Sequence, residues 1–88
     1  MIQTGLTCKK KITVTPEMTA AAMGSGALEV LATPSMIALM EGTAQEAVQS
    51  LLEDGQGTVG TRIDVRHLAA TPVGMKVTCT AEVAEVDR

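Results

Sequence analysis

The stretch Thr33–Glu53, with the sequence TPSMIALMEGTAQEAVQSLLE, decides the fold because it carries a long helical pattern. Threonine followed by proline is a typical helix start, since the hydroxyl can cap the first turn and proline fits the first helical position. Asp54-Gly55 follows, and glycine readily takes the positive φ that ends a helix. We therefore predict one long helix over Thr33–Glu53.

Most apolar side chains of this predicted helix gather on one face when residues are placed about 100° apart. The face comprises Met36, Ile37, Met40, Ala44, Ala47, Val48, Leu51 and Leu52. Thr43 and, as an outlier, Leu39 fall on the polar side. Glu41 lies inside the apolar arc. A buried carboxylate is costly unless it is paired, hydrogen-bonded or protonated, so Glu41 is either a glutamate that reaches water at the margin or a functional group.

Three other segments alternate between apolar and polar residues, as strands with one buried face do. They are Leu6–Val14, Thr58–Leu68 and Met75–Val86. A short helical turn and a flexible loop over Glu17–Ala27 precede the long helix. The order strand, helix, strand, strand predicts an α+β domain with an antiparallel sheet on one helix face. Since three strands are few for such a helix, we expect residues 1–88 to form one domain that is incomplete at its C-terminus.

The composition argues against several functional classes. The 88 residues include no Phe, Tyr or Trp and carry a net charge of −3, so neither stacking platforms nor a basic field for nucleic acid is present. The uncharged runs are too short to span a membrane, and no signal peptide is evident; we expect a soluble, cytoplasmic protein. Cys8 and Cys79 lie outside any CxxC pattern, which predicts two reduced thiols and no metal site. A small core without aromatic side chains favours a homo-oligomer.

Three residues can carry chemistry: Thr33, Glu41 and His67. His67 is the single histidine, and it falls on the apolar side of the second predicted strand. Each residue also has an ordinary structural interpretation, as a helix cap, a marginal glutamate and a core histidine. If the helix covers the sheet, Glu41 and His67 can approach one another. A hydroxyl, a carboxylate and an imidazole together are the parts of a site for acyl transfer or hydrolysis.

Three stretches resemble hotdog-fold thioesterases of the fluoroacetyl-CoA thioesterase-like family. They are Ala32–Glu41, Gly57–Thr61 and His67–Met75, the last with the specific sequence HLAATPVGM. The resemblance covers nearly the whole chain. It implies a hotdog fold, in which an antiparallel sheet wraps around one long helix, and a homodimer or higher homo-oligomer that hydrolyses an acyl-CoA thioester without a cofactor.

The same resemblance implies the roles of single residues. Thr33, Glu41 and His67 match the catalytic set of the family, with Glu41 as nucleophile or general base and His67 as proton shuttle. Gly60 matches a substrate-binding glycine, where an acyl carbonyl can approach the backbone. The phenylalanines linked to fluoroacetyl selectivity have no counterpart in this chain. The resemblance therefore implies a small acyl-CoA substrate but not fluoroacetyl specificity.

Two other hypotheses stay open. The chain can be a non-catalytic hotdog module that binds acyl groups or dimerises, because open sheet edges favour pairing with another chain. It can also be a hotdog hydratase of enoyl thioesters, although the sequence holds no separate motif for that reaction. Release of free thiol from an acyl-CoA distinguishes a thioesterase from a binding module.

Overall fold

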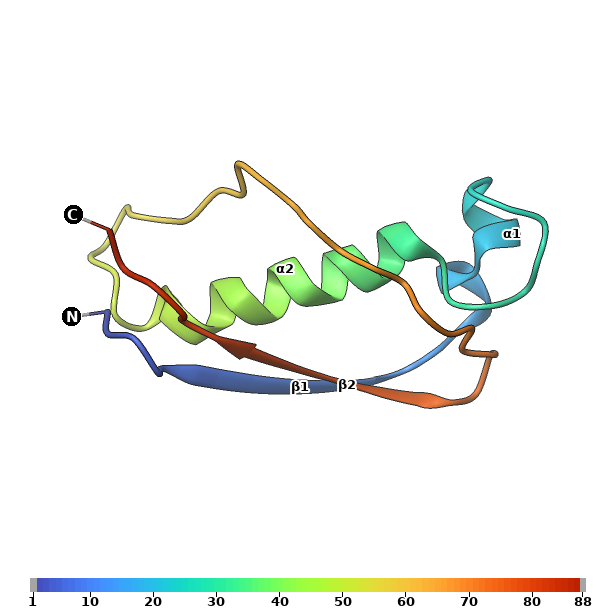
Figure 1. The fold of residues 1–88 in the computed structure, drawn as a ribbon, viewed down its shortest axis with the longest axis horizontal. Helices are drawn as coiled ribbons and strands as arrows, with labels where there is room; N and C mark the ends of the chain where they lie inside the picture. The colour runs from blue at the N-terminus through green and yellow to red at the C-terminus, as the bar shows by residue number, and fades with distance from the viewer. Residues whose placement is uncertain (1, 88) are drawn as a thin grey trace.

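The structure of this chain is a computed structural model that describes residues 2–87. In chain order the elements are strand β1 (Thr7–Thr13), the 3₁₀ turn η1 (Pro16–Met18), the short helix α1 (Ala20–Met23), the long helix α2 (Thr33–Gln49) and strand β2 (Lys76–Glu82). The two strands form an antiparallel ribbon against one side of α2, and the segment after α2 runs back along the helix toward its start (Figure 1). The predicted α+β class is confirmed.

The β1–β2 ribbon confirms two of the three predicted strands, with shorter ends. Ile12 lies opposite Val77, and Cys8 lies opposite Ala81. These four side chains are half-buried and alternate with exposed neighbours, as the period of two predicted. Cys8 and Cys79 both carry free thiols. The hydrophobic alternation therefore identified the face of each strand that packs on the helix.

The remaining predicted strand, Thr58–Leu68, is wrong for the described part of the chain. The sheet within residues 2–87 has two strands rather than about three, and this segment is extended backbone without a ladder partner. A strand requires N–H···O=C bonds to a neighbouring strand. In the described residues β1 and β2 pair with each other, and neither pairs with Thr58–Leu68. Val59, which alternation places on the same side of this segment as His67, is 88% exposed. Alternation indicates an extended chain but cannot supply the neighbour that makes it a strand.

Helix α2 confirms the predicted long helix, although it ends at Gln49 rather than at Glu53. Its buried residues are Leu39, Thr43, Ala47 and Val48. The prediction that Leu39 and Thr43 lie on the polar side is therefore wrong, while Met40 and Ala44 of the predicted apolar arc are exposed. Ala47 and Val48 of the predicted arc are buried, so the buried face overlaps that arc but is turned toward Leu39 and Thr43.

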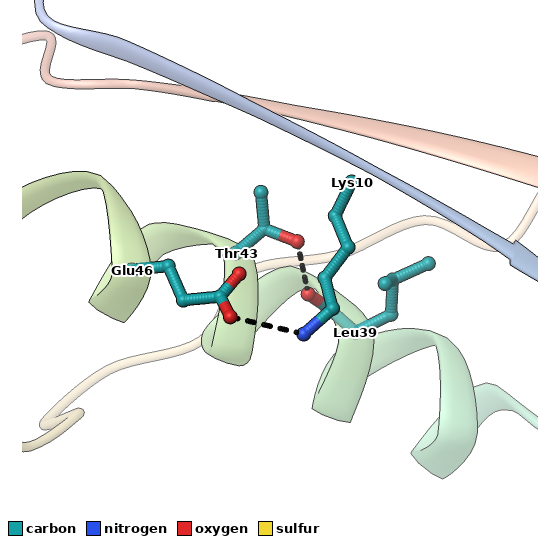
Figure 2. Close-up of polar contacts among 4 residues, drawn as sticks. All are labelled: Lys10, Leu39, Thr43 and Glu46. Atoms are coloured by element: carbon teal, nitrogen blue, oxygen red, sulfur yellow. Dashed lines mark hydrogen bonds and ion pairs between the residues drawn. The ribbon is translucent and has the colours of Figure 1, made fainter.

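Two polar contacts accompany the packing of the helix on the ribbon (Figure 2). The Thr43 hydroxyl donates to the backbone carbonyl of Leu39 at 2.7 Å, which satisfies the hydroxyl in its fully buried position. At the exposed margin, Lys10 of β1 lies 3.3 Å from the carboxylate of Glu46. An exposed ion pair of this kind contributes at most about 1 kcal/mol, so burial of the helix face dominates.

The most buried apolar side chains of the described residues lie near the start of α2. Val14, Leu31 and Ala32 are 1–2% exposed. The Leu31 N–H donates to the Thr71 carbonyl at 2.8 Å, and Val30 forms an antiparallel bridge with Pro72. These bonds fasten the loop that follows His67 beside the residues that precede Thr33.

We expect Leu31→Ala to lower the free energy of unfolding by about 2–5 kcal/mol, because it deletes a side chain that is 2% exposed and leaves a cavity. Urea unfolding followed by circular dichroism measures the change. Leu28→Ala is the matched control: the same atoms are removed from a side chain that is 67% exposed, so the expected change is within about 0.5 kcal/mol. Equal losses in the two variants would contradict this location of the core.

Candidate active site

Thr33 and His67 meet at the start of α2. The N-cap residue is Ala32, held in an extended conformation with its N–H on the Met18 carbonyl at 2.8 Å, and Thr33 is the first residue of the helix. The predicted capping role of Thr33 is therefore wrong. Its hydroxyl bonds elsewhere: Thr33 Oγ1 lies 2.8 Å from His67 Nδ1, and the tautomer of the ring decides which atom donates.

An open cavity of about 300 Å³ lies beside this pair. Its walls are mostly small or aliphatic side chains, contributed by α1, by the residues before α2 and by the loop after His67. They include Ala20, Ser25, Val30, Leu31, Leu68, Ala69 and Ala70. Among the described residues that line it, His67 is the one ionisable side chain. An apolar recess with a few polar groups at one end is typical of small-molecule sites.

Glu41 lies apart from this pair. It is exposed on α2 about two helical turns beyond Thr33, roughly 12 Å along the axis. The structure agrees with the interpretation of Glu41 as a glutamate that reaches water, and within a single chain its carboxylate lies beside Gly60 rather than beside His67. Glu41 lines a cavity of about 340 Å³ between α2 and the extended segment, together with Gly60 and Arg62.

The structure thus brings the candidate residues together in two pairs, Thr33 with His67 and Glu41 with Gly60. Arg62, which lines two cavities together with Glu41, was not predicted from the sequence. Alternation assigned Arg62 and Ile63 to opposite faces, whereas both border the same cavities. The prediction of an extended segment could have pointed to Arg62, whereas the alternation of its side chains could not.

Two features are absent from residues 2–87. No cluster of three or more His, Cys, Asp or Glu side chains is placed to hold a metal ion. No helix in this part of the chain combines the length and the apolar character needed to cross a membrane.

Comparison with known proteins gives the family. A family model described as fluoroacetyl-CoA-specific thioesterase matches residues 14–88. The chain belongs to this family. A curated member, the fluoroacetyl-CoA thioesterase of Streptantibioticus cattleyicolor, is 49% identical over 59 residues. That match covers 67% of this chain but only 42% of the curated relative, less than half of its length.

Solved structures confirm the hotdog fold of this family member. A phenylalanine-to-alanine variant of the fluoroacetyl-CoA-specific thioesterase, in complex with fluoroacetate and CoA, superposes with a TM-score of 0.92 at 36% identity. The superposition covers 99% of this chain and 74% of that structure. A thioesterase superfamily member from Thermus thermophilus gives a TM-score of 0.88 at 30% identity, over 100% of this chain and 65% of its own.

Proposed function

We propose that this hotdog-family protein hydrolyses a small acyl-CoA thioester to the free acid and CoA. The observation that carries the proposal is the 2.8 Å contact between Thr33 Oγ1 and His67 Nδ1 beside an open cavity, in a chain of a thioesterase family. In this proposal His67 shuttles a proton and Thr33 orients or hydrogen-bonds the reacting group. Glu41 is the nucleophile or the general base, and the Gly60 backbone receives the thioester carbonyl.

The reaction adds water across the carbonyl carbon and breaks the carbon–sulfur bond. As general base, Glu41 takes a proton from the attacking water; as nucleophile, it first forms an anhydride that water then cleaves. In both routes the leaving thiolate of CoA gains a proton, which His67 can deliver. The aromatic-free cavity walls give no support to a preference for fluoroacetyl over other small acyl groups.

We also propose that the working unit is a homodimer or a higher homo-oligomer. Glu41 and the Thr33–His67 pair are separated within one chain, so a second copy offers a route to a complete site. Met40, Val59 and Ile63 are exposed large apolar side chains that line the two cavities beside Glu41, and exposed apolar side chains that gather at one place favour an interface. The proposed setting is the cytoplasm, with residues 1–88 in one domain.

The test is release of free thiol from acetyl-CoA and longer acyl-CoA thioesters, followed with a thiol-reactive dye. We expect release above the buffer rate and sedimentation as a dimer or larger species. A folded chain that binds acyl-CoA in calorimetry but releases no thiol would refute the proposal and favour the binding module. Release by a strictly monomeric chain would refute the proposed assembly.

A further inference from the structure

Gly60 lies in the extended segment directly under the carboxylate of Glu41. A Cβ atom added at Gly60 would stand 2.8 Å from Glu41 Oε2 and 3.9 Å from Glu41 Cδ, and beyond its own chain neighbours would meet no other atom within 4 Å. Cβ atoms of real residues essentially never approach a neighbour closer than 3.0 Å. The space that a side chain at this position needs is therefore already occupied, and by one group alone.

Backbone conformation does not explain this glycine. Positive φ angles occur at Gly5, Gly24, Gly55 and Gly74, where other residues would be strained. Gly60 is not among them. Gly57, in the same extended segment, also lacks a positive φ, and a Cβ added there would meet nothing within 4 Å. Of these two comparable glycines, only Gly60 contacts a proposed catalytic group.

We propose that Gly60 is a positioning residue: its missing side chain provides the space in which the Glu41 carboxylate is held for reaction. The inference rests on the proposed role of Glu41 in thioester hydrolysis and adds a role for Gly60 that does not require contact with the substrate. A side chain at position 60 displaces the far end of an exposed, flexible glutamate, which costs little stability. The same displacement costs activity, because a misplacement of about 1 Å can lower a rate about 100-fold.

Gly60→Ala tests this role against Gly57→Ala. We expect Gly60→Ala to lower kcat about 10–100-fold, and Gly57→Ala to keep wild-type kinetics. Rescue is the sharper test. Glu41→Asp withdraws the carboxylate by one methylene, so the double variant Glu41→Asp with Gly60→Ala should be more active than the product of the two single effects.

A measurement without substrate separates this inference from the proposed function. In NMR spectra of the wild-type chain, a nuclear Overhauser effect should join the γ-protons of Glu41 to the α-protons of Gly60, and it should be lost in Gly60→Ala. If wild type lacks this nuclear Overhauser effect, the inference is overturned whether or not the chain hydrolyses thioesters. Its presence in a chain that hydrolyses no thioester supports the positioning and refutes the proposed function. A Gly60→Ala variant with unchanged kcat and no rescue also overturns it, since the gap would then serve the substrate alone.

Discussion

Glu41→Gln should lower the rate of thioester hydrolysis by at least about 100-fold while the fold stays intact. Glutamine keeps the shape of the side chain but can neither accept a proton from water nor attack the thioester carbonyl. Glu41 is exposed on α2, and its carboxylate lies beside Gly60. The substitution therefore removes no core packing. Thiol release measures the rate, and circular dichroism with urea unfolding measures the fold.

Glu46→Gln is the control for the change in charge. Glu46 lies on the same helix and is also exposed, and it loses only its surface ion pair with Lys10. We expect its hydrolysis rate to stay within about twofold of wild type. Wild-type turnover in Glu41→Gln would exclude Glu41 both as nucleophile and as general base. Equal losses in the two variants would indicate a general effect of helix charge.

The long helix and the ribbon were predictable because their signals are local. Thr33–Gln49 shows a helical period, and β1 and β2 show a period of two with one half-buried face. Thr58–Leu68 has the same period of two but no neighbouring strand in the described chain. Strand pairing depends on the neighbouring strand as well as on the segment. The alternation within Thr58–Leu68 therefore could not predict whether this segment pairs.

The side of the helix that is buried was harder to predict, because the buried face is turned from the predicted apolar arc toward Leu39 and Thr43. Thr43 can be buried only because its hydroxyl finds the Leu39 carbonyl one turn back. The sequence shows that residue 43 is a threonine, but it does not show whether the hydroxyl will bond to the Leu39 carbonyl or to water. Exposure of Met40 follows from the same choice of face.

The candidate site was predictable in its residue types but not in its geometry. A hydroxyl, a carboxylate and an imidazole can be selected from the sequence by their chemistry. That Thr33 meets His67 follows from the bridge between Val30 and Pro72, a long-range contact without a local signal. The contact between Glu41 and Gly60 has no signal either, because a glycine contributes no side chain to a pattern. The catalytic roles themselves remain predictions.

His67→Asn should lower kcat by at least about 100-fold with little loss of stability. An asparagine amide can take roughly the place of Nδ1 and keep a hydrogen bond to Thr33, whose Oγ1 lies 2.8 Å from that nitrogen. It cannot shuttle a proton to the leaving thiolate, because an amide does not titrate near neutral pH. The rate is measured by thiol release at saturating acyl-CoA, beside urea unfolding of the same variant.

Thr33, which contacts His67, supplies the control for this last prediction. Thr33→Ser keeps a hydroxyl and should retain most activity, whereas Thr33→Val removes it and should lower kcat about 10–100-fold. Because the two side chains touch, Thr33→Val combined with His67→Asn should cost less than the product of the single losses. Fully multiplicative losses would mean that the two groups act independently. A His67→Asn variant with wild-type kcat would remove His67 from the reaction and leave the 2.8 Å contact as a structural hydrogen bond.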